Sequence, residues 1–551
     1  MFLFFAGHAA ILALLLVTAA GAGTLALGAG EGLALRAALG LALFGHACFF
    51  LAAVGQLRPL SLIALTIVAI AGGAVRTRGI ARPSVSHVVA VVLVIAPLFA
   101  FALYPPIAFD ETLYHLPFVR ALAHDGALRF LPAVRFPVFP QFHELLCVPV
   151  LLLVGDVATH LVALAEVIVT AALLIEWARR YDVRAGWLAA ALFLGSPLVI
   201  QLATITYVDA ALALFVAAGF YALDRERFLL AGFFVGTACS VKYLGWYFAL
   251  AALIIVLVRT AGRRREAGMF VIAWAVAALP TTTWIVLHTR DPFFPFVRTS
   301  LWLLPPSRAI SFGERIVGAL RVIWDVTFVR GRVNHQPPVT SLLILMVAVV
   351  IAASIRDTRA RWVALLCAGY VAVFAFLPQD SRYLVPLLPL LSVTAAVIVA
   401  RRRGKATALL AILALLAVAP GVAYAGYRIA LWGVPPVTAS QRSAWLSEHV
   451  HAYRALARAG NERVYVCGGE ELKDYAAGEL LGGFNGPFSH ERILGDAHDT
   501  ASIAQRLRRI DAHYFLVVKR SCSHLLPNGG MILTYEDAVA QLWRVQPAPE
   551  R

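Results

Sequence analysis

Residues 105–145 read PPIAFDETLYHLPFVRALAHDGALRFLPAVRFPVFPQFHEL and form a polar insert between apolar segments of membrane-spanning length. The insert concentrates ionisable groups, namely Asp110, Glu111, His115, His124, Asp125, Arg129, Arg135, His143 and Glu144. It also carries aromatic rings, at Phe109, Tyr114, Phe118, Phe130, Phe136, Phe139 and Phe142. Any loop that is exposed to water tends to be polar. A purely solvated linker, however, would not be expected to carry so many aromatic side chains. The mixture predicts short amphipathic helices at the membrane interface, with charges facing a water-filled cleft.

The composition of the whole chain is that of a polytopic membrane protein. Of its 551 residues, 61% are hydrophobic and 14% charged, and the mean hydropathy is +0.79, which excludes a set of soluble domains. The net charge of +16 does not indicate nucleic-acid binding, because the arginines fall in short clusters between apolar runs. No spacing of Cys and His suggests zinc. We expect an all-α membrane bundle of about fourteen transmembrane helices.

Basic clusters predict the orientation of the bundle, because they tend to remain cytoplasmic. The clusters are Arg76, Arg78 and Arg82; Arg179 and Arg180; Arg225 and Arg227; Arg263, Arg264 and Arg265; Arg356, Arg359 and Arg361; and Arg401, Arg402, Arg403 and Lys405. With the N-terminus outside, all of them fall on the cytoplasmic face, and the 105–145 insert falls outside. The apolar segment 145–154 must then be re-entrant or interfacial, because it is too short to cross. The N-terminal stretch lacks the basic region of a cleaved signal peptide and is expected to be a retained span.

A small extracytoplasmic α/β domain is predicted after Gly433, where hydrophobicity falls. Short strands are expected at 464–467, 514–518 and 541–545, with helical periodicity at 441–459 and 501–511. Cys467 and Cys522 both follow strand-like runs in an oxidising compartment, and we therefore hypothesise that they form a disulfide. The predicted division is additional membrane helices over 1–83, a membrane core over 84–432 and the C-terminal domain over 433–551.

Asp110 and Glu111 are the first candidates for chemistry. They follow a span, where an ionised carboxylate escapes the cost of about 3 kcal/mol of lying at the bilayer centre. Because adjacent carboxylates repel, one of them is better poised as a proton acceptor. The alternative is an acidic pair that caps the helix that follows, since Asp is a good N-cap. The spacing alone leaves both interpretations open.

Three further charged residues lie near the predicted outer ends of spans. Lys242 is either a functional intramembrane lysine or one that snorkels to the interface. Arg382 is either a topological anchor or, together with Lys242, a clamp for a phosphate, because a guanidinium fork matches phosphate oxygens. Asp209 could equally orient a substrate or pair with a nearby basic group.

With these residues in view, the sequence resembles the GT-C superfamily of integral-membrane glycosyltransferases. It is most similar to the bacterial branch of protein O-mannosyltransferases and lipid A aminoarabinose transferases. The resemblance covers most of 84–432 and rests on motifs in a fixed order: FDETLYHLPFVRALAHDG, PQFHELL, GDVATHLVALAEV, YVDAALALF, SVKYLGWY, DPFFPF and SRYLVPLLPLL. Each motif alone is weak, and their order and shared face make the set fairly specific.

The resemblance implies transfer of a sugar from a polyprenyl-phosphate-linked donor to a glycan, lipid or protein acceptor, with inversion at the anomeric carbon. Asp110 would be the base, with Glu111 beside it, and Lys242 and Arg382 would bind the lipid phosphate as it leaves. The other expected substrate-binding residues are Tyr114, His115, Arg135, His143, Asp209, Tyr243 and Tyr383. The branch generally works without a divalent metal, so no cofactor is expected. The implied location is the cytoplasmic membrane of a bacterium, among membrane lipids, with the active site outside.

Three other interpretations compete with this one. A transporter or lipid flippase predicts charged residues near the span midplanes and inverted repeats, whereas the candidates here lie at one edge and no repeat is evident. An O-antigen ligase or polymerase shares the lipid-linked donor but lacks this early Asp-Glu loop. A non-catalytic scaffold would tolerate Asp110→Asn.

Overall fold

The computed structural model describes residues 1–76, 85–259, 264–297, 302, 311–329, 337–340, 342–402, 406–495, 500–522 and 530–547. Arg78, Arg82, Arg263, Arg403 and Lys405 of the predicted basic clusters lie outside these ranges. The chain divides into two compact units. The helical unit comprises Met1–Tyr104, Pro140–Trp284 and Ala309–Pro435, and the α/β unit comprises Pro105–Phe139, Ile285–Arg308 and Pro436–Arg551.

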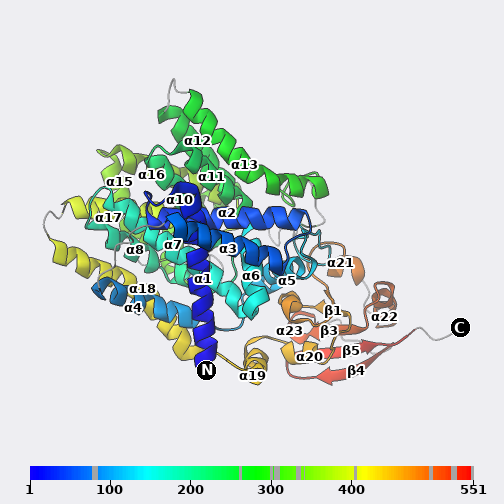
Figure 1. Cartoon of the computed structure of the whole chain (residues 1–551). Coiled ribbons are helices and arrows are strands. Elements are labelled where there is room, and N and C mark those ends of the chain that lie inside the picture. Colours follow the sequence, from blue (N-terminus) through cyan, green and yellow to red (C-terminus); the bar gives the residue numbers. More distant parts are fainter. Residues whose placement is uncertain are drawn as a thin grey trace. The chain divides into compact units, whose positions relative to one another are not determined.

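The helical unit is a bundle of apolar helices (Figure 1). Its helices are α1 (Phe2–Leu27), α2 (Leu33–Ala53), α3 (Pro59–Arg76), α4 (Val85–Phe101), α6 (Phe142–Val154), α7 (His160–Arg179), α8 (Ala185–Leu194), α9 (Pro197–Leu202), α10 (Asp209–Asp224), α11 (Phe228–Val241), α12 (Gly245–Arg259), α13 (Arg264–Thr289, which runs on into the α/β unit), α14 (Phe312–Phe328), α15 (Leu343–Ser354), α16 (Thr358–Phe374), α17 (Leu388–Arg402) and α18 (Thr407–Trp432). Two 3₁₀ helices, η2 (Asp156–Thr159) and η3 (Ser381–Leu387), precede α7 and α17.

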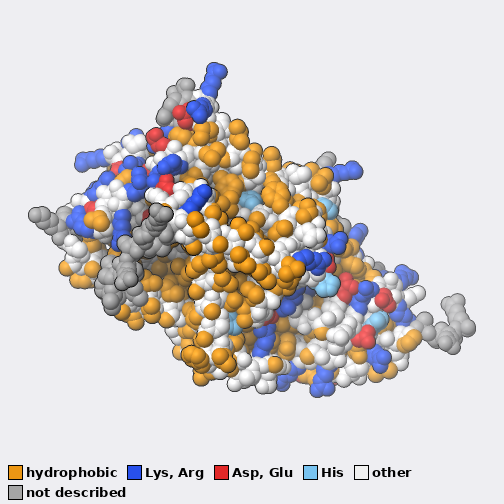
Figure 2. Space-filling view, in the orientation of Figure 1, with side chains coloured by type: hydrophobic (Ala, Val, Ile, Leu, Met, Phe, Trp, Pro, Cys, Tyr) orange, Lys and Arg blue, Asp and Glu red, His pale blue; other side chains and the backbone are white. Residues whose placement is uncertain are grey.

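The polytopic helical bundle predicted from composition is confirmed. Seven helical stretches among the described residues are long and apolar enough to cross a membrane, and several shorter apolar helices accompany them. Helix α6 has 13 residues and is therefore about 20 Å long, short of the roughly 30 Å hydrocarbon core. Figure 2 shows hydrophobic side chains over much of the bundle surface, and exposed examples are Leu60, Ile67, Leu93 and Ile272. Such a surface suits lipid rather than water.

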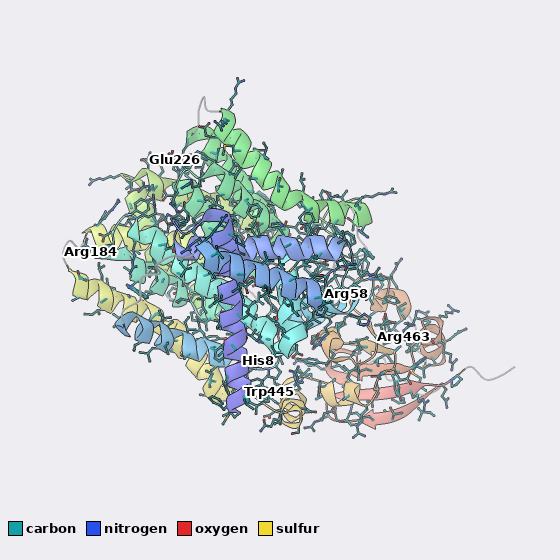
Figure 3. The ribbon with its side chains drawn as sticks, viewed as in Figure 1. His8, Arg58, Arg184, Glu226, Trp445 and Arg463 are labelled. Carbon is teal, nitrogen blue, oxygen red and sulfur yellow. A yellow bond between two sulfur atoms is a disulfide. The ribbon has the colours of Figure 1, made fainter. Side chains whose placement is uncertain are left out.

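Several basic clusters converge at one end of the helical unit. Contacts at this end join Arg184 to the Ala400 carbonyl, Arg227 to Glu31, Arg259 to Glu226 and Arg359 to Asp224. These contacts link the start of α8 to the end of α17, the turn between α1 and α2 to the start of α11, and the end of α10 and the turn after it to the start of α16 and the end of α12. Figure 3 shows Arg184 and Glu226 toward one end of the bundle and Arg58 away from it. The grouping predicted from the positive-inside trend is therefore found in three dimensions.

The α/β unit contains a five-stranded sheet in the order β2-β1-β3-β5-β4. Its strands are β1 (Val464–Cys467), β2 (Leu480–Leu481), β3 (Tyr514–Val518), β4 (Met531–Glu536) and β5 (Ala540–Val545). Strand β1 is parallel to β2 and β3, and β5 is antiparallel to β3 and β4. The predicted strands at 464–467, 514–518 and 541–545 are confirmed. Strand β2 was not predicted because this strand is only two residues long. Strand β4 was not predicted because it is an edge strand whose side chains are largely exposed.

Short helices complete the α/β unit: α19 (Ala439–His449), α20 (Tyr453–Ala457), η4 (Glu470–Tyr475), α21 (His490–Ile493), α22 (Thr500–Arg509) and α23 (Lys519–Cys522). Helix α22 forms because apolar residues recur with helical spacing, and it buries Ile503, Ala504 and Leu507 in the core beside β1 and β3. The hypothesised disulfide between Cys467 and Cys522 is present, and the Cα atoms of the pair lie 6.1 Å apart.

The first part of the polar insert folds within the α/β unit. A π-helix, η1 (Glu111–His115), leads into α5 (Leu116–Asp125), which ends at Gly126 in the left-handed conformation. Arg120 on α5 makes a bidentate contact with the buried Asp474, with Nε–Oδ1 at 2.6 Å and Nη2–Oδ2 at 3.0 Å. Bidentate pairs fix orientation as well as supplying energy. The insert is thus anchored to the C-terminal sheet domain, from which it is far removed in sequence.

Candidate functional site

In the helical unit, Asp209 and Lys242 form a largely buried ion pair. Asp209 opens α10, and Lys242 follows α11 in an extended conformation that ends the helix. The Lys242 Nζ lies 2.7 Å from the Asp209 Oδ1, and the two side chains are 19% and 0% exposed. A carboxylate that is fully buried requires a partner of this kind. Of the two alternatives for Asp209, the structure shows pairing with a basic group.

Arg382 is held by the aspartate two residues before it. The Asp380 side chain accepts a hydrogen bond from the Arg382 backbone N–H at 3.1 Å and lies 2.8 Å from its Nε. The guanidinium stacks on two aromatic rings, 4.8 Å from the centre of Tyr207 and 5.5 Å from that of Tyr383. Lys242 Nζ lies 4.3 Å from the same Tyr383 ring. The fold therefore gathers both predicted phosphate-binding cations around one tyrosine, with cation–π attraction to its ring.

The residues around these cations are fixed in position. The buried Tyr370 donates its hydroxyl hydrogen bond to the Tyr383 carbonyl at 2.5 Å. Asp209 and Asp380 are almost wholly inaccessible, whereas Lys242 and Arg382 keep some exposure, 19% and 11%. Each cation thus contacts a buried carboxylate, and part of each cationic side chain remains exposed. Such an arrangement can make charge-assisted hydrogen bonds to a phosphate. We call Asp209, Lys242, Asp380, Arg382 and Tyr383 the cationic cluster.

Two predicted residues of this unit remain. Tyr243 follows Lys242 and is half-buried in the turn between α11 and α12. His143 on α6 is fully buried, with Nδ1 3.0 Å from the Glu166 Oε1 and Nε2 3.6 Å from the Cys147 sulfur. Within the described part of the chain, these contacts join α6 to α7, and none of them joins His143 to the cationic cluster.

In the α/β unit, Asp110 and Glu111 occupy different environments although they are adjacent. Glu111 is fully buried, and its Oε2 accepts a hydrogen bond from the Ala108 N–H at 3.1 Å. Asp110 is partly exposed, and its side chain makes no capping hydrogen bond to the helix that it precedes. Of the acidic pair, Glu111 therefore makes a capping contact at the start of the helix and Asp110 makes none. Single-turn π-helices often mark functional positions, and η1 begins immediately after Asp110.

The other predicted residues of this unit lie in an aromatic cluster. The Tyr114 ring is 4.2 Å from that of His115 and 5.1 Å from that of Phe136, and both Tyr114 and His115 are buried. The Arg135 guanidinium lies 5.4 Å from the Phe136 ring. These contacts hold the insert together, and Arg135 also reaches a pocket shared with the sheet domain.

This pocket is small and lies within the described part of the α/β unit. Its volume is about 20 Å³, and its lining residues include Leu113, Arg135, Glu470, Lys473, Gly483, Phe484 and Asn485. Lys473 donates a hydrogen bond to the Leu480 carbonyl at 2.5 Å, and burial lowers its pKa to about 8. Burial raises the pKa of Glu470, but a 2.8 Å contact with His490 and hydrogen bonds from the backbone N–H groups of Gly469 and Glu470 together hold the pKa below its usual value.

The buried Lys473 gives the α/β unit a specific pH dependence. Its folded pKa of about 8 lies below the unfolded value of about 10.4, so the unfolded chain binds more protons between these values and stability rises with pH. We expect a gain of about 1 kcal/mol between pH 7 and pH 9. Urea unfolding of the full chain in detergent, followed by pulse proteolysis of the α/β unit, measures it. The Lys473→Met variant should lose this rise, and an equal rise in the variant would contradict the assignment.

Sequence reasoning missed five residues of these sites. Asp380, Tyr207 and Tyr370 support the cations, and Glu470 and Lys473 line the pocket. Only Asp380 left a local signal, because an Asp two residues before Arg382 is placed to accept its backbone N–H. The others are brought in by long-range packing. Among the described residues, no group of three or more His, Cys, Asp or Glu side chains is arranged to hold a metal ion.

Comparisons with known proteins agree with this architecture. The family model described as dolichyl-phosphate-mannose-protein mannosyltransferase matches residues 147–286, and no curated protein sequence matches significantly. Crystal structures of ArnT from Cupriavidus metallidurans, apo and bound to undecaprenyl phosphate, superpose with a TM-score of 0.58 at 17% and 15% identity, covering 84% of this chain and 98% of theirs. The archaeal oligosaccharyltransferase AglB from Archaeoglobus fulgidus is more distant, with a TM-score of 0.49 at 12% identity, over 80% of this chain and 70% of that one. The chain therefore has the same fold as ArnT, in agreement with the resemblance to the GT-C superfamily that its sequence motifs carry.

Proposed function

We propose that this chain is a glycosyltransferase that moves a sugar from a polyprenyl-phosphate-linked donor to an acceptor outside the cytoplasmic membrane. The observation that carries the proposal is the cationic cluster, in which Lys242 and Arg382 share the Tyr383 ring in front of buried carboxylates. Two cations held by buried carboxylates suit the phosphate of a lipid-linked donor. ArnT, which shares the fold, has been crystallised with undecaprenyl phosphate, and the matching family model is named for a dolichyl-phosphate-linked donor.

In the proposed reaction, an acceptor hydroxyl attacks the anomeric carbon of the lipid-linked sugar. The bond between this carbon and the phosphate oxygen breaks, and the electron pair leaves with the polyprenyl phosphate. Lys242 and Arg382 stabilise the negative charge that develops on the leaving phosphate. Because the phosphate departs as a stable anion, the donor is already activated and no nucleotide-binding loop is required.

Asp110 is proposed to take the proton from the acceptor hydroxyl as the new bond forms. It is the more accessible of the two adjacent carboxylates, whereas Glu111 is buried and already accepts the Ala108 N–H. A general base must reach solvent-borne or substrate protons, which favours Asp110. The disulfide between Cys467 and Cys522 supports an oxidising compartment for the α/β unit, consistent with chemistry outside the cytoplasm.

Mass spectrometry of the cell envelope tests the proposed function directly. Deleting the gene is expected to remove one sugar from a glycan, lipid or glycoprotein and to raise the level of the matching polyprenyl-phosphate sugar. Expressing the wild-type chain should reverse both changes, and the missing sugar would name the donor and the acceptor together. An envelope in which no sugar is lost and no lipid-linked sugar accumulates would exclude the transferase.

A further inference from the structure

The largest cavity among those found in the described helical unit lies at the end that carries the basic clusters. It has a volume of about 380 Å³, within the range of small-molecule sites. Its walls come from the ends of α7, α10 and α12, from the beginning of α16 and from most of the length of α17. Asp224 is the last residue of α10 and lines this cavity, whereas Asp209 of the cationic cluster is the first residue of the same helix. The 16-residue length of α10 places the two sites about 20 Å apart.

The cavity has an apolar wall and a charged mouth. The apolar side chains that line it include Phe220, Ile255, Leu390, Val393, Val397 and Ile398. The charged side chains are those of Asp224, Arg259, Asp357, Arg359 and Arg401, accompanied by Trp177, Tyr181 and Trp362. Trp and Tyr with Arg at the end of an apolar wall are typical of the depth at which lipid headgroups meet hydrocarbon.

The two aspartates at the mouth are already engaged within the protein. Asp224 accepts hydrogen bonds from the Trp177 indole at 3.1 Å and from the Tyr181 hydroxyl. Asp357 caps α16 by accepting the backbone N–H groups of Arg359 and Ala360 at 2.8 and 3.0 Å. Their lone pairs are therefore partly used. Arg259 pairs with Glu226, whose Oε1 is 3.2 Å from its Nη2, so Arg359 and Arg401 are the arginines of the mouth that can meet an anion.

Two of the arginines converge on one ring. The Arg359 guanidinium lies 4.0 Å from the centre of the Tyr181 ring and that of Arg401 lies 5.7 Å from it. The Arg359 side chain is 61% exposed, and its Nε is 3.8 Å from the Asp224 Oδ1. Paired guanidinium groups present several N–H donors to one anion, and this geometry matches phosphate oxygens.

From this arrangement we propose that the cavity is a binding site for an anionic glycerophospholipid of the leaflet at that end of the bundle. Arg359 and Arg401 bind the phosphate, and an acyl chain lies along the α17 wall formed by Val393, Val397 and Ile398. Basic pockets between transmembrane helices bind anionic headgroups on this principle. The site lies at the opposite end of α10 from the cationic cluster and does not depend on the proposed transferase activity.

Native mass spectrometry of the full chain in a zwitterionic detergent tests the site with two lipids of identical acyl chains. Phosphatidylglycerol is expected to bind about tenfold more tightly than phosphatidylcholine, because only the former carries a net negative charge. The double variant Arg359→Gln/Arg401→Gln should remove this preference.

Arg361→Gln is the matched control. Arg361 lies two residues further along α16, outside the cavity, with its guanidinium on the Ser354 and Ile355 carbonyls, and its loss should leave phosphatidylglycerol binding unchanged.

A second variant tests the apolar half of the site. Val397→Trp is expected to fill the wall and to weaken both lipids without altering the charges at the mouth. Equal binding of the two lipids by the wild-type chain would overturn the proposal, as would an equal loss in Arg359→Gln/Arg401→Gln and Arg361→Gln. Displacement of phosphatidylglycerol from this cavity by undecaprenyl phosphate at much lower concentration would also overturn it, because the site would then belong to the carrier lipid.

Discussion

The Asp110→Asn variant is expected to lose sugar transfer almost completely while reaching the membrane at the wild-type level. An amide has nearly the shape of the carboxylate but cannot accept the acceptor proton, and positioned general bases contribute about 10²- to 10⁴-fold to rates. The loss should appear in the turnover number. Binding of polyprenyl phosphate should remain, since Asp110 is not proposed to touch the phosphate. The measurement is transfer from the donor identified by the envelope analysis, with binding followed separately.

Two neighbouring carboxylates supply the controls for Asp110. Asp125 ends α5 in the same insert and pairs with His124 and Arg129, and Asp125→Asn should leave transfer unchanged. Glu111→Gln keeps an oxygen that can accept the Ala108 N–H, so this variant should retain far more activity than Asp110→Asn. If Asp110→Asn transfers sugar at the wild-type rate, or if Glu111→Gln is the inactive variant, the base has been wrongly assigned.

Lys242→Met is expected to have the second large effect, on both binding and stability. Removing the ammonium deprives the leaving phosphate of one of its two cations, and we expect transfer to fall by about 100-fold or more. The same change strands the buried Asp209 carboxylate, and breaking a buried pair from one side costs about 3–5 kcal/mol. A single variant therefore cannot separate a binding role from a structural one.

The double variant Asp209→Asn/Lys242→Met makes that separation. It removes both charges, so thermal stability should return most of the way to the wild-type value, whereas polyprenyl phosphate affinity and transfer should stay low. Tyr383→Phe is a matched control, because it keeps the ring that Lys242 and Arg382 contact. A double variant that binds polyprenyl phosphate as tightly as the wild type would show that Lys242 serves only to neutralise Asp209.

Local sequence patterns were sufficient to predict most of the helices and strands. The apolar run that begins near Phe2 matches α1 because a continuous apolar stretch of that length has no other stable form in a bilayer. The predicted strands at 464–467 and 514–518 match β1 and β3, because short runs of β-branched and aromatic residues favour strands. The basic clusters indicated a shared face because charges cannot cross the hydrocarbon. Helix α14 was not predicted from the sequence.

Periodicity, composition and motif order thus determined the membrane class, most helix and strand positions, the GT-C resemblance and the residue types that the chemistry needs. Only the tertiary structure decided which of those residues meet: Asp209 with Lys242, both cations with Tyr383, and Arg120 of the insert with Asp474. The reason is physical. A helix or strand is fixed by neighbours a few residues away, whereas an ion pair or a shared ring depends on how distant segments pack, and no local pattern records that packing.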